Sequence, residues 1–515
     1  MAGRNEQRVL LSLSALLVLI GATLLASLYP RAVFVDDAWS GAHAYWLANV
    51  GYVRSDLESA YWSRLGDATP GLFKGIEHLE NKLVVDHKLL TIQGGLLIRL
   101  FGLNFYLLKS LSLAYLIAVL WVARLIITRL SGNTTLWYRT FLVLFLCSPL
   151  TFEAAYRFRP EMMVAALGML SYQCLDTGVR ARKVTYMALA GVMAGLAMSA
   201  HLNGVVYVVA GMVVIAGASR LPGLIAFAAG AGAGFLPYFY DMTSRADLSL
   251  WLVQFRHYPV MAQSNFGLLG LLLKPLHEVD RFVHKPPELV LSFLIVVVGF
   301  WSYRYLRARC RQLLLYTACL MAGLAVFSSS KHPRYLMTYL PFLCILMGIG
   351  SEAIYTQVVS LSTYVRRYLA PFAIGAYLLV SYATILGVVA HDRWDMLAPQ
   401  RDLSARMRLG SRVVAPIAFT FATIEHHPVQ GLEFYEMLKE RGLVPAGTTP
   451  FGFAAESGGD YLIVDRGCVK RWHLADATSF GEYELVQRLP AGEGREEYWL
   501  FERSAEAIRP NANRR

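Results

Sequence analysis

Long apolar runs recur along the first 390 residues of the chain, and short segments between them carry most of the charges. A run of about 20 apolar residues is the length that an α-helix needs to cross a hydrocarbon core about 30 Å thick. The pattern therefore predicts an all-α membrane protein with about eleven transmembrane helices. They are expected at residues 9–29, 106–128, 138–153, 161–178, 184–200, 203–219, 221–239, 288–303, 312–328, 335–351 and 368–389.

The composition supports the same class of protein. Hydrophobic residues make up 56% of the chain and charged residues only 16%, whereas about 25% of the residues in a soluble domain are charged. A large soluble enzyme is therefore excluded. The first apolar run follows a short basic start and is longer than the core of a signal peptide, so we expect a retained span, with cleavage as the alternative.

The formal charge of +12 comes mostly from short loops between the predicted spans. Basic loops of this kind set the orientation of a membrane protein, so they do not indicate nucleic-acid binding. The richest of them, Arg304 to Arg311, is expected to be cytoplasmic, and alternation places the other basic clusters and the N-terminus on the same side. The six cysteines form no CxxC pair and are interpreted as small core residues.

Alternation places the long connections 30–87 and 240–287 and everything after residue 390 on the opposite, outer face. The segment His87 to Gly102 is apolar but only about sixteen residues long. A helix lying at the interface keeps the topology consistent, although a full span is the alternative. Because long loops are usually functional, we expect the chemistry on the outer face.

The tail differs in character from the rest. Alternating apolar positions predict strands at 412–419, 461–465, 483–487 and 497–501, and an amphipathic helix over 431–441 that Gly442 closes. We therefore expect two domains, a polytopic membrane domain (1–390) and a small extracytoplasmic α/β domain (391–515).

Two adjacent carboxylates, Asp36 and Asp37, directly follow the first predicted span. An aromatic-rich amphipathic stretch comes next, which suits an interfacial helix with the carboxylates near its N-cap. One of them could accept the proton of an attacking hydroxyl as a general base. Simple helix capping is the structural alternative.

Further polar groups are predicted on the same face. Arg157, Arg159 and Glu161 lie between two spans, with Pro160 at the first helical position, and charges at a membrane boundary are costly to place without a function. Lys331, His332 and Arg334 break the positive-inside trend and invite a phosphate, with snorkelling to lipid head groups as the alternative. The remaining candidates are Asp86, His87, Lys88, His201 and Asn203, for which a turn or a packing role is the alternative.

The order of these motifs resembles the polytopic glycosyltransferases of the GT-C fold, in particular the bacterial group around protein O-mannosyltransferases and lipid A aminoarabinose transferases. The resemblance covers roughly residues 9–351. It is carried by the acidic pair, by Asp86-His87-Lys88 with the following apolar stretch to Asn104, by Arg159-Pro-Glu161-Met and by Lys331-His-Pro-Arg-Tyr335.

This resemblance implies transfer of a sugar from a polyprenyl-phosphate donor to a glycan, lipid or protein acceptor at the periplasmic face of a bacterial inner membrane. It implies that Asp36 is the base and that Glu161 is the acidic residue of the second outer loop. The family often has Thr-Lys-Gly where this chain has His201-Leu-Asn203-Gly204, so the cations at 331–334 are the better candidates for the donor phosphate. A divalent cation among the carboxylates is left open, as are a transporter or flippase for a lipid-linked sugar and a non-catalytic subunit.

Overall fold

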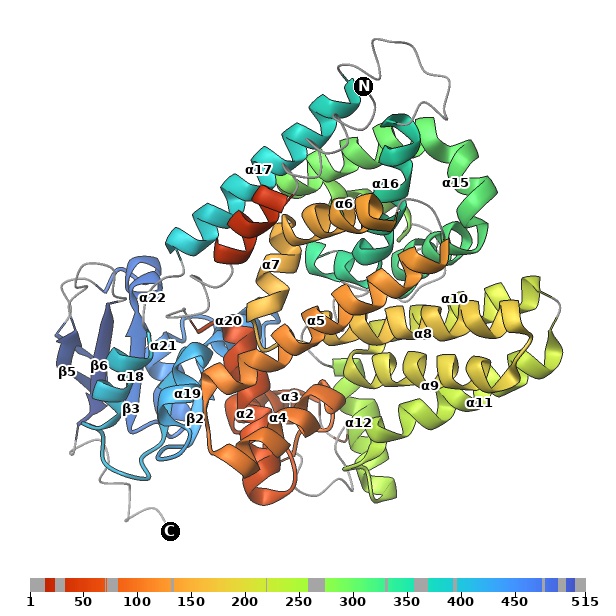
Figure 1. Ribbon diagram of the computed structural model, residues 1–515. Helices are drawn as coiled ribbons and strands as arrows, with labels where there is room; N and C mark the ends of the chain where they lie inside the picture. The colour runs from red at the N-terminus through yellow and green to blue at the C-terminus, as the bar shows by residue number, and fades with distance from the viewer. Residues whose placement is uncertain are drawn as a thin grey trace.

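The computed structural model describes residues 14–23, 33–69, 71, 82–130, 134–218, 220–257, 274–328, 332–355, 369–391, 396–474, 478–489 and 497–504. Figure 1 shows a sheet at one end of the molecule and a group of helices, α8 to α11, at the other end. Helices α2, α3 and α4 lie between these two parts. The long helix α5 runs past them toward the remaining apolar helices.

The helices of the first 391 residues are mostly those that the apolar pattern predicts. They are α2 Val35–Val50, α3 Ser59–Ala68, α4 Lys88–Phe101, α5 Phe105–Leu130, α6 Thr134–Leu146, α7 Pro149–Tyr156, α8 Glu161–Ala181, α9 Val184–Ala200, α10 Val205–Gly217, α11 Leu221–Phe235, α12 Arg245–His257, α14 Val279–Val283, α15 Pro286–Phe327, α16 Leu340–Tyr355 and α17 Ala370–His391. Short 3₁₀ helices are η1 Asp56–Glu58, η2 Leu202–Gly204, η3 Leu236–Phe239, η4 Leu276–Glu278 and η5 Pro333–Thr338. Of the first predicted span, the structure describes a helix at Ser14–Thr23.

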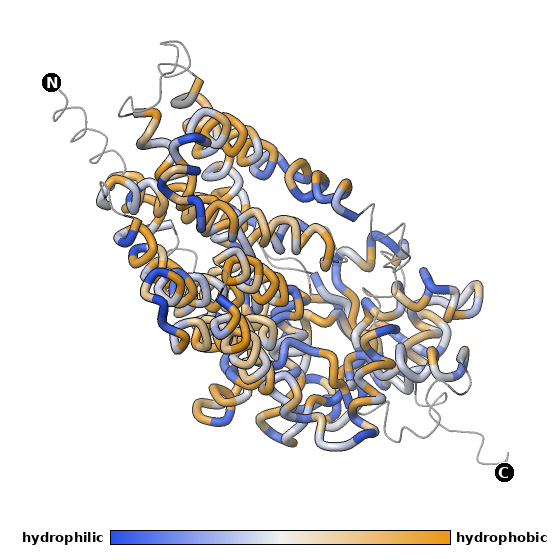
Figure 2. Tube along the Cα trace, turned by 90° about the vertical axis from the view of Figure 1, so that its right-hand side faces the viewer, coloured by the Kyte–Doolittle hydropathy of each residue, from blue (hydrophilic) through white to orange (hydrophobic). Residues whose placement is uncertain are grey.

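Among the described residues, four helices are long and apolar enough to cross a membrane, or five if the bent pair α6 and α7 counts as one span. These four are Phe105–Leu130, Leu221–Phe239, Pro286–Phe327 and Phe372–His391. Figure 2 shows hydrophobic residues along most of the helices, and more hydrophilic positions in the C-terminal region. The chain is therefore a multi-pass membrane protein, but the predicted number of eleven spans is not confirmed.

The predicted basic loop at 304–311 is helical and not an extended connection, although the chain kinks within it at Cys310. Spans 288–303 and 312–328 both lie within α15, which consists of two helices joined at a kink at Cys310. Neither glycine nor proline interrupts 304–311, and its arginines, leucine and alanine favour the helix.

The predicted span 138–153 is broken in the middle. Helices α6 and α7 meet at an angle of 74°, and Ser148 between them has extended backbone angles. Pro149 explains the break, because a proline excludes the helical conformation from the residue before it. The bend gives α7 a direction of its own, and α7 leads directly into the Arg157–Glu161 turn.

The short apolar segment at 87–102 forms α4, with 14 residues. Such a helix is about 21 Å long, less than the hydrocarbon thickness. It packs against α2, where Gly94 and Gly95 allow close contact with Ala44. Its length supports the interfacial interpretation.

The tail contains a six-stranded sheet in the order β2-β1-β3-β6-β5-β4. The strands are β1 Val413–Ala415, β2 Val429–Gly431, β3 Tyr461–Asp465, β4 Ser479–Phe480, β5 Tyr483–Leu489 and β6 Tyr498–Arg503, and the helices are α18 Leu397–Ser404, α19 Thr420–Thr423, α20 Glu433–Glu440, α21 Pro450–Glu456 and α22 Arg466–Arg471. Strands β2, β1 and β3 are parallel, and β6, β5 and β4 continue the sheet antiparallel.

Two details of the predicted tail are wrong. The expected strand 412–419 ends at Ala415, because Pro416 has no N–H for a central strand. The expected helix 431–441 begins at Glu433, since Gly431 ends β2. Gly442 does follow this helix, with a φ of 66° that suits glycine.

Helices α9 and α11 pack with their backbones in contact. Gly191 and Gly195 on α9 face α11, and Gly230 and Gly234 on α11 face α9. A β-carbon at any of these four positions would overlap a backbone carbonyl oxygen of the other helix. Pairs of glycines four residues apart are a frequent device for close helix contact in membranes.

We therefore expect Gly195→Leu to destabilise the protein by about 3 kcal/mol, because the added side chain forces the two helices apart. The measurement is the thermal midpoint of the purified protein in detergent. Gly232→Leu is the matched control, since a β-carbon at this α11 position meets no atom within 4 Å. Equal midpoints for the two variants would contradict the prediction.

Candidate active site at the ends of the helices

Helix α2 begins at Val35, directly before the acidic pair. Asp36 and Asp37 both lie in its first turn, where the helix dipole favours negative charge. The Asp37 side chain is fully buried, whereas the Asp36 side chain is 38% exposed. Burial raises the pKa of Asp37, although Lys109 and Arg157 oppose this shift. Only Asp36 is therefore open to an incoming hydroxyl group.

The turn between α7 and α8 brings a guanidinium group to this carboxylate. Arg159 forms an ion pair with Asp36. Its Nε and Nη2 also donate hydrogen bonds to Glu161, with Nε at 3.0 Å and Nη2 at 2.6 Å from Oε1. Glu161 is the first residue of α8 and Pro160 is its N-cap, one position earlier than predicted. Arg159 thus joins the acidic residues of two segments that are far apart in sequence.

A second guanidinium group reaches Asp36 from the other half of the chain. Arg334 in η5 donates a hydrogen bond from Nη1 to Asp36 Oδ2 at 2.7 Å. The Nδ1 atom of His332 accepts the backbone N–H of Arg334 at 3.2 Å. Burial and the charge of Arg334 lower the pKa of His332 to about 4. His332 is therefore neutral near pH 7.

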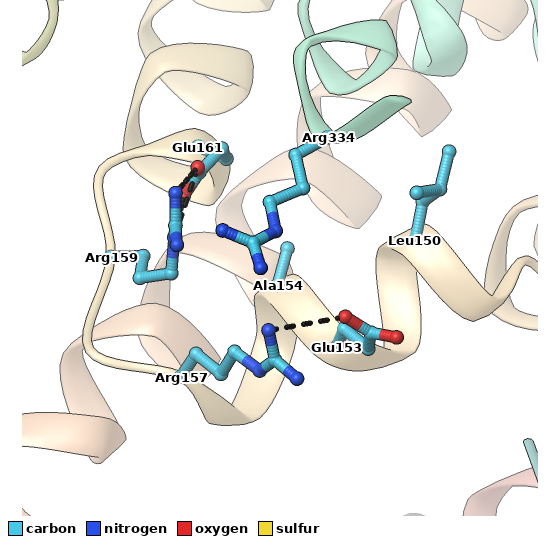
Figure 3. Close-up of a pocket in the computed structure, with 7 residues that line it drawn as sticks. All are labelled: Leu150, Glu153, Ala154, Arg157, Arg159, Glu161 and Arg334. Carbon is cyan, nitrogen blue, oxygen red and sulfur yellow. Dashed lines mark hydrogen bonds and ion pairs between the residues drawn. The ribbon is translucent and has the colours of Figure 1, made fainter. Parts of the chain in front are cut away.

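A small pocket lies beside these groups. It is lined by Leu150, Glu153, Ala154, Arg157, Arg159, Glu161 and Arg334. Figure 3 shows the guanidinium group of Arg334 pointing into the space between Arg157 and Arg159. Three guanidinium groups and two carboxylates line it, and the Asp36 carboxylate pairs with two of these guanidinium groups. Such a lining suits an anion that can accept hydrogen bonds from planar guanidinium groups.

A second small pocket also has Glu161 in its lining. It is lined by Glu161, Val164, His201, Asn203, Tyr335, Met337 and Thr338. His201 Nδ1 accepts the backbone N–H of Asn203 at 3.0 Å, so the neutral ring carries its proton on Nε2. Burial and the neighbouring His87 lower the pKa of His201 to about 3. The His87 and His201 rings stack at 4.9 Å, so both belong to this pocket's surroundings.

The other members of the Asp86-His87-Lys88 motif form a buried ion cluster. Lys88 Nζ lies 2.8 Å from Asp86 and 2.6 Å from Asp241. Burial opposes the charge of Lys88, but the two carboxylates outweigh it and raise the pKa of this ammonium group. The side chain is not exposed to solvent. A direct contact between Lys88 and a substrate would therefore require that this cluster open.

The structure thus brings together most of the residues that the sequence singled out. Asp36, Arg159, Glu161 and Arg334 form one connected group, and Arg157, His201 and Asn203 line the two adjoining pockets. Lys331 lies outside the described residues. Within the part of the chain that the structure describes, no three His, Cys, Asp or Glu side chains are placed to hold a metal ion.

Sequence reasoning missed several residues of this site. Arg281 is fully buried and donates a hydrogen bond to the carbonyl of His332 at 2.9 Å, so it supports the η5 turn. Glu153 forms an ion pair with Arg157 at 3.2 Å, and Lys109 lies 4.0 Å from the Phe105 ring centre. Glu153 is the single charge of α7, and Lys109 is the only charge in the first four turns of α5. A charge inside an apolar helix is a signal that could have identified both residues.

The comparisons with known proteins bear on the fold. Neither a family model nor a curated protein sequence matches the chain. The crystal structure of ArnT from Cupriavidus metallidurans bound to undecaprenyl phosphate superposes with a TM-score of 0.55 at 15% identity, over 96% of this chain and 99% of that chain. The apo state of the same protein gives a TM-score of 0.54 at 14% identity, over 99% and 100%.

The apo oligosaccharyltransferase from Archaeoglobus fulgidus is also similar. Its TM-score is 0.53 at 10% identity, over 88% of this chain and 69% of that chain. Similarity at this level of identity concerns the fold, and it extends along nearly the whole chain. With the helices, the C-terminal sheet and the convergent charged residues described above, it shows that this protein has the GT-C fold.

Proposed function

We propose that this protein is a glycosyltransferase that moves a sugar from a polyprenyl-phosphate donor to an acceptor at the outer face of the membrane. The observation that carries the proposal is the contact of Asp36 with both Arg159 and Arg334 beside an anion-compatible pocket. A carboxylate and two guanidinium groups are what displacement of a phosphate by a hydroxyl group needs. The fold supports the proposal, since the similar ArnT structure contains undecaprenyl phosphate.

The reaction is a single displacement. The acceptor oxygen attacks the anomeric carbon, and the bond from this carbon to the phosphate oxygen breaks. Polyprenyl phosphate leaves with the electron pair, and Asp36 takes the proton of the acceptor hydroxyl. The anomeric configuration inverts, because only one displacement occurs. No strong general acid is needed, since a phosphate is already a good leaving group.

The arginines stabilise the charge that develops on the departing phosphate. Glu161 holds Arg159 through two of its nitrogen atoms, so this guanidinium group keeps its orientation when a phosphate binds. The Arg334 side chain is 32% exposed and forms an ion pair with Asp36. Arg334 can thus turn from the carboxylate to the phosphate, which leaves Asp36 able to accept a proton.

The donor's prenyl chain would lie in the hydrocarbon region next to the apolar helices. The site lies where α2, the α7–α8 turn and η5 meet, and all three follow predicted spans on the outer side. We therefore assign the reaction to the periplasmic side of a bacterial inner membrane, with residues 1–390 as the membrane domain and 391–515 as an extracytoplasmic domain. A flippase for the same lipid-linked sugar is the second candidate.

Replacement of the base should abolish most of the transfer. For Asp36→Asn we expect kcat to fall at least about 100-fold, because a positioned general base typically contributes 10²–10⁴-fold. The measurement is the transfer of radiolabelled sugar from a synthetic polyprenyl-phosphate donor by the purified protein in detergent. Asp402→Asn, at an exposed position on α18, is the matched control.

Near-wild-type turnover by folded Asp36→Asn would remove the mechanism. The same assay separates the enzyme from the flippase. Detergent solution has no compartments, so donor consumption there requires chemistry. Wild-type protein that consumes no donor in detergent but moves it across vesicles would establish the flippase instead.

Loss of the second guanidinium group should weaken donor binding. A hydrogen bond to a charged group contributes about 1.5–3 kcal/mol, so Arg334→Gln should raise the Kd for polyprenyl phosphate about 10- to 150-fold. Titration of the purified protein with polyprenyl phosphate measures this constant. Arg406→Gln, an exposed position in the tail, should leave it unchanged, and an unchanged Kd for Arg334→Gln would contradict the role of Arg334.

The pH dependence should show no titration of His332 in the neutral range. The pKa of His332 is lowered to about 4, so the ring is uncharged at every pH from 5.5 to 8. We expect His332→Gln and the wild type to have parallel profiles of kcat/KM over this range. A change in kcat/KM near pH 6.5 that occurs in the wild type and is absent from His332→Gln would contradict the neutral state of His332.

The lowered pKa of His332 should also make the stability of the folded protein depend on pH. In the unfolded chain His332 takes up its proton near pH 6.5, whereas the folded protein takes it up only near pH 4. Its contribution to stability is therefore present above pH 6.5 and is lost as the pH falls toward 4. His332→Gln should be less sensitive to acid than the wild type.

A further inference from the structure

We propose that the C-terminal sheet domain is a positioning element of the active site, because it holds α2 and thereby places Asp36 between Arg159 and Arg334. This inference rests on the proposed function. It gives a role to the tail, whose contacts with the first outer loop no sequence motif indicates. Three separate contacts carry it.

The first contact is a ring set directly on α2. Phe421, from α19 of the tail, lies against Gly41 so closely that a β-carbon at Gly41 would overlap the ring. The same ring makes an edge contact with Phe105 at the start of α5, with the ring centres 4.8 Å apart. Phe421 is 7% exposed. One side chain of the tail therefore fixes the distance between α2 and α5.

The second contact is a buried amide on β2. Gln430 is 2% exposed, and its Oε1 accepts hydrogen bonds from Ser59 Oγ at 2.9 Å and from the Ala60 N–H at 3.0 Å. Its Nε2 donates to the carbonyl of Leu57 at 2.7 Å. A buried amide that satisfies three polar groups of another segment specifies one relative position, because a shift would leave them unpaired.

The segment that Gln430 holds is in turn bonded to α2. Glu58 is 1% exposed and accepts hydrogen bonds from the indole N–H groups of Trp39 at 2.8 Å and Trp62 at 3.0 Å. Trp39 belongs to α2, one turn after Asp36. A continuous set of hydrogen bonds thus leads from β2 through η1 to the helix that carries the proposed base.

The third contact joins the tail to α3 and α12. Arg441, which follows α20, donates hydrogen bonds to the hydroxyl oxygen of Tyr61 and to the carbonyl of His257 at 3.2 Å. The Tyr61 hydroxyl donates to the same carbonyl at 2.6 Å. Tyr61 has no exposed surface. The tail therefore contacts both long outer connections, 30–87 and 240–287, and holds them together with α2.

The position of α2 matters because Asp36 must act on an acceptor that lies near the donor. A displacement of about 1 Å at a reacting group can cost 10²-fold in rate. The Arg159–Glu161 pair belongs to α8 and its preceding turn, so it does not depend on the tail. A shift of α2 should thus lower kcat and leave donor binding nearly intact.

The test uses the full chain with Gly41→Ala, the double variant Gly41→Ala/Phe421→Leu, Gln430→Leu and the control Gly375→Ala. A β-carbon at Gly375 on α17 meets no atom within 4 Å. We expect Gly41→Ala and Gln430→Leu to lower kcat at least about 10-fold, with KM for the donor within about twofold. Phe421→Leu should restore much of the activity of Gly41→Ala, because it removes the overlapping ring atoms.

Hydrogen–deuterium exchange gives a readout that does not depend on the reaction. Amides of α2 should exchange faster in Gly41→Ala and Gln430→Leu, those of α8 should not change, and the double variant should return toward the wild type. Exchange equal to that of Gly375→Ala would overturn the docking of the tail. Faster exchange with unchanged kcat would overturn the positioning role.

Failure of the proposed function gives a different pattern. In that case the wild type itself transfers no sugar, and Asp36→Asn has no activity to lose. The exchange data would then still decide whether the tail holds α2. An active wild type with a large Asp36→Asn effect and no effect of Gly41→Ala would overturn the positioning role alone.

Discussion

The Asp36 carboxylate is shared by two guanidinium groups that come from turns far apart in sequence, Arg159 before α8 and Arg334 in η5. Charges at the edge of a hydrocarbon region are costly unless they are paired. The pairing therefore constrains three outer segments, α2, the α7–α8 turn and η5, to meet at one place. Other features, including the Glu161 clamp on Arg159 and the Arg281 support of η5, maintain this meeting.

The charged groups around the site are balanced in pairs and small clusters. Lys88 lies between Asp86 and Asp241, Arg157 faces Glu153, and Arg159 is bound by Glu161. Arg334 is paired with Asp36, and its side chain remains partly exposed.

Much of the architecture could be predicted from the sequence, because a bilayer imposes a length and a polarity on every span. The acidic pair at the start of an interfacial helix follows from Asp36 and Asp37 after an apolar run. The break at Ser148-Pro149 and the helical 304–311 segment follow from local preferences that the apolar pattern does not weigh. Strand β2 was missed because three buried residues give no periodicity.

The candidate site was predictable only as a set of residues on one face. Alternation of spans placed Asp36, Glu161 and the 331–334 segment together, but no pattern reports that Arg334 rather than His332 is charged. Burial decides that point, and burial depends on contacts such as that of Arg281 with the His332 carbonyl. The docking of the tail was likewise hidden, since Gly41 and Gln430 carry no chemical signature of their own.

The seating of Gln430 against the first outer loop has a consequence for biosynthesis. Ala60 precedes its partner Gln430 by 370 residues. At about 5–20 residues per second, the ribosome therefore needs roughly 20–70 s to reach Gln430 after it has added Ala60. During this interval α2 can enter the interface, yet the groups that fix its place do not exist. The nascent protein therefore passes through a stage in which its membrane portion is inserted but α2 is not yet held by the C-terminal domain.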